Sequence, residues 1–113
     1  MELITEPIPL ARLREMAERT FGDMVKAVVD IERGIMAVDG ELHSDEEELL
    51  LQNGSRQANL WGINIYPDAG AEDWIEFDSM INLRPSQDNR TRGVEDPDRR
   101  RRILEIVSRL VMR

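Results

Sequence analysis

The residue types best suited to holding a ligand follow a strand-like segment near residue 80. They are Asn82, Arg84, Ser86, Arg90 and Arg92. Arginine presents paired N–H groups that match a carboxylate or a phosphate, and the amide and hydroxyl groups can orient the same anion. The segment contains no glycine-rich phosphate loop, so a solvated loop held by Asp88, Glu95 and Asp96 is the plainer alternative.

A polar face on a predicted sheet is the second candidate site. Alternation along residues 61–66 and 74–84 puts Asn64 and Glu76 on one face, together with Asp78, Asn82 and Arg84. Gly62, expected opposite Asp78, would leave room above the sheet for a ligand. Antiparallel sheets often turn such a face to water, which is the alternative without function.

His43 and Asp78 are the candidates for acid–base chemistry. His43 is the only histidine and can act as a general base near neutral pH. Glu41 and Asp45 flank it, but a transition-metal site usually needs a second histidine, so no metal and no cofactor are predicted. The chain has no cysteine, which excludes thiolate ligands and nucleophiles.

The length and the net charge limit the classes to which the protein can belong. A chain of 113 residues fits one domain over residues 1–113, and a net charge of −8 argues against general nucleic-acid binding. Arg84–Arg102 carries seven arginines against four acids, whereas the rest of the chain carries −11. A GC-rich genome or adaptation to salt would also explain a chain with 14 arginines and one lysine. The sequence shows no signal peptide or apolar span, so we expect a cytoplasmic protein that does not enter membranes.

Hydrophobic periodicity places the elements that would hold these residues. Leu10, Leu13, Met16 and Ala17 recur at helical spacing after Pro9. A hairpin is predicted from strands 25–31 and 35–38, with a three-residue loop that pairs Ile31 with Ile35. This hairpin is apolar on both faces, which predicts a central place in a sheet or a homodimer contact.

Two further helices and a long strand complete the prediction. Ser44 and Glu47 suggest a capping box that opens a short helix with Leu49, Leu50 and Leu51 on its buried side. Asp96 and Pro97 predict the start of the last helix, whose apolar stripe is Ile103, Ile106, Val107, Leu110 and Val111. A second hairpin sets Tyr66 opposite Trp74. The expected fold is α+β, a mainly antiparallel sheet of four to five strands with two longer amphipathic helices, N-terminal and C-terminal, and one short middle helix.

Three segments together resemble a small uncharacterised prokaryotic family described only as a domain of unknown function. They are Phe21–Asp30, Leu60–Pro67 and Trp74–Asn82 with Arg84–Ser86. The resemblance covers nearly the whole chain, which implies a self-standing unit, and it brings no activity with it.

These observations lead to a ranked expectation of function. The first is a non-enzymatic binding or interaction module that holds an anionic ligand, or an acidic segment of a partner, at the Asn82–Arg92 loop and the polar sheet face. The alternative is a small enzyme acting on a phosphorylated or carboxylated metabolite, with Asp78 or His43 as acid or base and Arg84 as anion anchor. A homodimer through the first hairpin is a third possibility.

Overall fold

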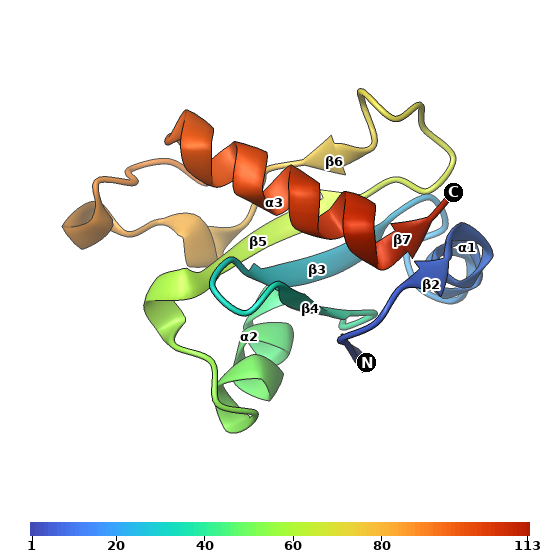
Figure 1. Ribbon diagram of the computed structural model, residues 1–113, viewed down its shortest axis with the longest axis horizontal. Coiled ribbons are helices and arrows are strands. Elements are labelled where there is room, and N and C mark those ends of the chain that lie inside the picture. The colour runs from blue at the N-terminus through green and yellow to red at the C-terminus, as the bar shows by residue number, and fades with distance from the viewer.

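The computed structural model describes residues 1–113 as a five-stranded sheet with helices on both faces (Figure 1). The strands are β1 Glu2–Ile4, β2 Ile8–Pro9, β3 Val25–Asp30, β4 Ile35–Val38, β5 Leu60–Ile65, β6 Ile75–Glu76 and β7 Val111–Met112, and the helices are α1 Leu10–Arg19, α2 His43–Gln52 and α3 Pro97–Leu110. The main sheet has the order β1-β4-β3-β5-β6, and every pair in it is antiparallel. The predicted α+β class is confirmed, with α1 and α2 equal in length.

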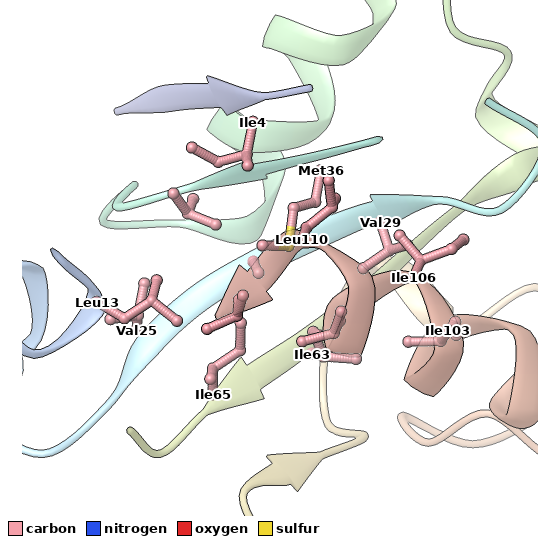
Figure 2. Packing of buried hydrophobic residues seen from close by; sticks show 14 of the residues in the cluster. Ile4, Leu13, Val25, Val29, Met36, Ile63, Ile65, Ile103, Ile106 and Leu110 are labelled. Atoms are coloured by element: carbon pink, nitrogen blue, oxygen red, sulfur yellow. The ribbon is translucent and has the colours of Figure 1, made fainter. Parts of the chain in front are cut away.

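The larger core lies between one face of the sheet and helices α1 and α3. Figure 2 shows Val29 and Ile63 from the sheet meeting Ile103, Ile106 and Leu110 from α3. All five side chains are fully buried. The predicted stripe of the last helix is therefore its buried side, except that Val111 has already left the helix and pairs in β7 with Ile8 of β2.

Helix α2 covers part of the opposite face. Leu50 packs there with Val28, Ala37 and Leu60 in a smaller apolar cluster. The second apolar face of the first hairpin is thus covered by the chain's own helix, so the surface on which we expected a homodimer contact is not exposed. The central place of the hairpin in the sheet is confirmed.

The register of the first hairpin differs from the prediction by one residue. Asp30 lies opposite Ile35 and Val29 opposite Met36, whereas Ile31 was expected opposite Ile35. The cause is the Asp30 carboxylate, which accepts the backbone N–H groups of Glu32 and Arg33 and lengthens the turn to four residues. Gly34 closes this turn at φ +69°.

The two predicted helix starts have different outcomes. Asp96 caps α3 by accepting the N–H of Asp98, and Pro97 is the first helical residue, as predicted. Helix α2 instead begins at His43 after Leu42, and no side chain caps it, so the proposed capping box is wrong. Of the three leucines expected on its buried side, only Leu50 is fully buried, and Leu51 is exposed.

The predicted strand over residues 74–84 is mostly wrong, although its register holds where the strand exists. Ile75 pairs with Ile65 and Glu76 with Asn64, and the N–H of Tyr66 donates to Trp74. The chain then leaves the sheet and forms a 3-10 turn over Met80–Asn82.

The segment after β6 packs closely over Gly62. A Cβ at Gly62 would lie 2.5 Å from the Cβ of Ser79, so Ser79 occupies the room that we had assigned to a ligand. The Asn82 side chain then takes the place of a strand, because its amide accepts from the Gly62 N–H and donates to the Gly62 carbonyl. The longest helix, α3, has 14 residues, and neither it nor the shorter helices could span a bilayer.

Candidate functional site

A cavity of about 170 Å³ opens where the start of α2 meets the polar end of the sheet and the segment after β6. Its polar lining is Lys26, His43, Ser44, Ser79 and Arg92, and its apolar lining is Leu42, Met80 and Ile81. We call it the cationic cavity, since both charged residues that line it are basic.

Lys26 reaches the cavity from the central strand of the sheet. Its neighbour in the register is Asn64, which in turn lies opposite Glu76. The Asn64 amide nitrogen donates to Glu76 at 2.8 Å and to the Asp78 carbonyl at 3.4 Å. Asn64 is only 6% exposed and its Oδ1 has no hydrogen-bond partner, which leaves a buried acceptor on this face of the sheet.

Arg92 contributes the second positive charge. Its Nε donates to Asp78 at 2.7 Å, and both side chains are about half exposed, at 56% and 43%. An exposed ion pair of this kind is weak. The Arg92 guanidinium is therefore available to a second anion that competes with Asp78.

His43 is the first residue of α2 and faces the sheet. Its Nε2 lies 2.8 Å from the Ile63 carbonyl oxygen. Since a carbonyl only accepts, Nε2 carries the proton in this contact and Nδ1 is left with its lone pair. Burial lowers the pKa of His43 more than its hydrogen bond to the Ile63 carbonyl raises it, so the ring is neutral at pH 7.

The start of α2 adds backbone donors to the same region. Leu42 occupies the cap position with extended dihedral angles of −128° and 142°, and its side chain cannot accept a hydrogen bond. The first N–H groups of a helix need an acceptor from outside the helix, and they carry a partial positive charge. The Asp45 N–H already donates to the Leu42 carbonyl at 3.2 Å, so the N–H groups of His43 and Ser44 are the ones left to favour an anion beside Ser44 and Lys26.

Arg84, the anion anchor expected from the sequence, points into the protein. Its guanidinium donates to the backbone carbonyls of Leu60, Gln57 and Ile81 and lies 3.4 Å from Glu47. It also sits over the Trp61 ring, 4.6 Å from the centroid. Each of its three nitrogens is engaged within the chain, so Arg84 fixes the segment after β6 rather than facing a ligand.

Two asparagines hold the loop that follows. Asn82 is fully buried and ties Gly62 to the Arg92 carbonyl, whereas the sequence suggested that it orients a ligand. Asn89, which the sequence analysis missed, is also buried and donates to the carbonyls of Asn82 and Gly93. Asp88 just before it has φ +57°, and the Asp-Asn pair typical of such turns was the available signal.

The remaining predicted residues lie at different distances from the cavity. Ser86 is exposed, and the Arg90 guanidinium lies 3.9 Å from Asp88 with both side chains in solvent, so neither lines the cavity. Glu76 binds Asn64 and Tyr66 beside it. Lys26 was not among the predicted site residues, although a single lysine among alternating apolar residues of a central strand is a usable signal.

A larger hollow of about 480 Å³ lies on the other side of α2 and is acidic. Asp39, Glu41, Asp45 and Glu48 line it. No group of three or more histidine or acidic side chains is arranged to hold a metal ion. The cationic cavity is smaller, but two basic side chains and the start of α2 meet there, so we regard it as the candidate site.

Comparison with known proteins identifies the family. The chain belongs to the family described as a protein of unknown function, DUF5674, whose model matches residues 2–110. The suspected resemblance to a family of unknown function is thereby confirmed. The curated proteins gave no match, and neither did the solved structures.

Proposed function

We propose that this protein is a non-enzymatic binding module that holds a carboxylate or phosphate group in the cationic cavity. The observation that carries the proposal is the meeting of Lys26, Arg92 and the uncapped start of α2 at one opening. The proposal keeps the anionic ligand expected from the sequence. It moves the anchor from Arg84 to Lys26 and Arg92.

The charge of the rest of the molecule strengthens this choice. A chain of net charge −8 repels anions over most of its surface. A small opening lined by two cations and by helix N–H groups therefore stands out as a place where an anion gains energy. Neutral His43 and the hydroxyl groups of Ser44 and Ser79 supply further polar contacts without adding negative charge.

The test is binding of inorganic phosphate and of citrate, measured by calorimetry and by thermal unfolding at low ionic strength. An anion at a hundred times its dissociation constant adds about 2.7 kcal/mol to stability, which raises the midpoint by on the order of 10 °C. Lys26→Gln and Arg92→Gln should each weaken binding about tenfold. Arg90→Gln is the matched control, because Arg90 is an exposed arginine of the same loop outside the cavity.

Two results would contradict the proposal. One is the absence of any shift with either anion at low salt. The other is a shift that Arg90→Gln reduces as much as Arg92→Gln does, because the anion would then be attracted to the loop in general.

The alternative of a small enzyme is favoured by one observation, the neutral His43 with a free Nδ1 lone pair beside the cavity. In that case the anion of a carboxylated or phosphorylated metabolite would bind Arg92, and His43 would move a proton. His43→Asn would then abolish turnover of a substrate while weakening phosphate binding much less than Arg92→Gln does. A binding module without enzymatic activity would show no turnover either before or after this change.

A further inference from the structure

The cationic cavity has an apolar neighbour. A second hollow of about 460 Å³ is lined by Arg19, Thr20, Phe21, Glu41 and Leu42. Leu42 lines both hollows, and Lys26 lies over the Phe21 ring at 5.1 Å from the centroid. The second hollow and the cationic cavity are therefore two parts of one continuous surface, which we call the Phe21–Leu42 surface.

Three large apolar side chains of this surface are exposed and lie close to its polar groups. Leu42 is 54% exposed, Phe21 42% and Met80 63%, and all three border the openings. Large apolar side chains that gather beside polar groups mark binding surfaces more often than scattered ones do. The exposed leucine also stands at the helix cap position, where serine or aspartate would close the site.

We infer that this surface binds the free carboxyl terminus of a peptide segment whose last residue is apolar, an inference that rests on the proposed anion site. The terminal carboxylate enters the cationic cavity and accepts from Lys26, Arg92 and the first N–H groups of α2. The last side chain contacts Leu42 and Phe21. Capture of a chain end by backbone N–H groups beside a pocket for its side chain is a known mode of peptide recognition.

The chemistry of the surface favours a peptide over other amphipathic anions. Arg19, Thr20 and Glu41 surround the apolar contacts with polar groups that the backbone of a peptide can use as hydrogen-bond partners and an acyl chain cannot. The net charge of −8 opposes approach to an anionic membrane. A small inorganic anion would fill the cavity and leave the second hollow empty.

The experiment is a selection from a displayed peptide library with free carboxyl termini and four randomised last positions, carried out on the full chain. Selected peptides are then synthesised as free acids and as carboxyl-terminal amides, and their binding is measured by fluorescence polarisation. We expect an apolar residue at the last position, and we expect amidation to weaken binding about tenfold or more. Arg92→Gln should weaken the free acids to a similar degree.

A pair of leucine variants distinguishes the contributions of the two hollows to binding. Leu42→Ala should weaken peptides with an apolar last residue several-fold, by about tenfold at most, and should weaken inorganic phosphate by a smaller factor, because alanine, like leucine, leaves the start of α2 without a side-chain cap. Leu51→Ala is the control, because Leu51 is an exposed leucine of α2 that lines neither opening. Equal binding of acids and amides, or selection without an apolar preference, would overturn the inference.

The outcomes also separate this inference from the proposed function. If phosphate binds through Lys26 and Arg92 but no peptide is selected, the site holds small anions only and the peptide inference fails. If neither phosphate nor peptides bind, both proposals fail.

Discussion

Of the two positive charges that line the cationic cavity, that of Arg92 is already paired within the protein. Arg92 is held at 2.7 Å by Asp78, and Lys26 lies opposite the Asn64–Glu76 pair. An incoming anion therefore competes with Asp78 for Arg92. The affinity for an anion therefore depends on how strongly Asp78 holds Arg92, and not only on the number of basic residues.

Asp78→Asn should strengthen anion binding. The change keeps the shape of the side chain and removes the charge that competes for Arg92, so phosphate should bind about threefold to tenfold more tightly at low salt. Calorimetric titration checks this. If Asp78 is instead an acid or base of an enzyme, the same change abolishes turnover, and an unchanged or weaker phosphate affinity would count against the proposed site.

Arg84→Gln should destabilise the fold and leave anion specificity intact. The change strips hydrogen-bond donors from the Leu60, Gln57 and Ile81 carbonyls and removes the cation over Trp61. The expected loss in the free energy of unfolding is about 2–4 kcal/mol, measured by urea denaturation. Arg90→Gln should change stability by less than about 0.5 kcal/mol. Equal effects of the two changes would refute the structural role of Arg84.

Glu46 should make stability depend on pH. The side chain is fully buried in α2, and burial raises its pKa to about 9, although the Gly40 N–H donates to it at 2.9 Å. Between its ordinary value and pH 9 the folded carboxyl keeps a proton that the unfolded one loses. Stability contributed by this group is therefore complete at low pH and declines as the pH rises through that range.

Glu46→Gln should remove this dependence. Glutamine is neutral at every pH and can still accept from Gly40, so the variant should be more stable than the parent at pH 7–8. The parent should lose at most about 1.4 kcal/mol per pH unit relative to the variant. Urea denaturation at pH 5, 6, 7 and 8 measures the difference. Glu48→Gln, an exposed change in the same helix, should run parallel to the parent.

At the scale of elements, contacts of single side chains decided where strands and helices begin and end. The Asp30 carboxylate lengthened the first turn and shifted the β3–β4 register by one residue. Contact with Ser79 across Gly62 ended β6 after Glu76. At the start of α2, an exposed leucine replaces the polar cap that would satisfy the helix.

Leu42→Ser should therefore stabilise α2 and weaken anion binding at the same time. A serine cap adds about 0.5–1 kcal/mol to stability and occupies the N–H groups that the anion would use. Denaturation and phosphate titration of the same variant measure both effects. Leu51→Ser is the control at an exposed leucine of the same helix. Tighter phosphate binding by Leu42→Ser would show that the helix start is no part of the site.

At the scale of the whole molecule, the two ends of the chain share one core. β2 and β7 pair in parallel and lie side by side (Figure 1). Ile8 and Val111 are both buried in the core with residues of α1 and α3. Contacts between positions this distant in the sequence tie the first residues to the last. The sheet and its helices should consequently unfold as one unit.

Deletion of residues 111–113 should lower the free energy of unfolding by about 2–3 kcal/mol, because it exposes the space left by Val111 and removes the partner of β2. Circular dichroism and the fluorescence of Trp61 and Trp74 should report the same urea transition. Met112→Ser, at a residue that is 54% exposed, should have little effect. Two separate transitions would contradict a single cooperative core.

The sequence by itself determined the α+β class, the cap of α3 and the register where β5 meets β6, because each rests on periodicity or on neighbours along the chain. The resemblance of three of its segments also indicated the family. Only the tertiary structure decided the site. From the sequence, Arg84 was expected to be an exposed anion anchor, but in the fold it donates to the Leu60, Gln57 and Ile81 carbonyls. Lys26 was expected only to belong to a strand, but in the fold it lies beside Arg92 and the start of α2. Which donors face inward depends on acceptors from segments distant in the chain, and spacing along a sequence carries no information on that choice.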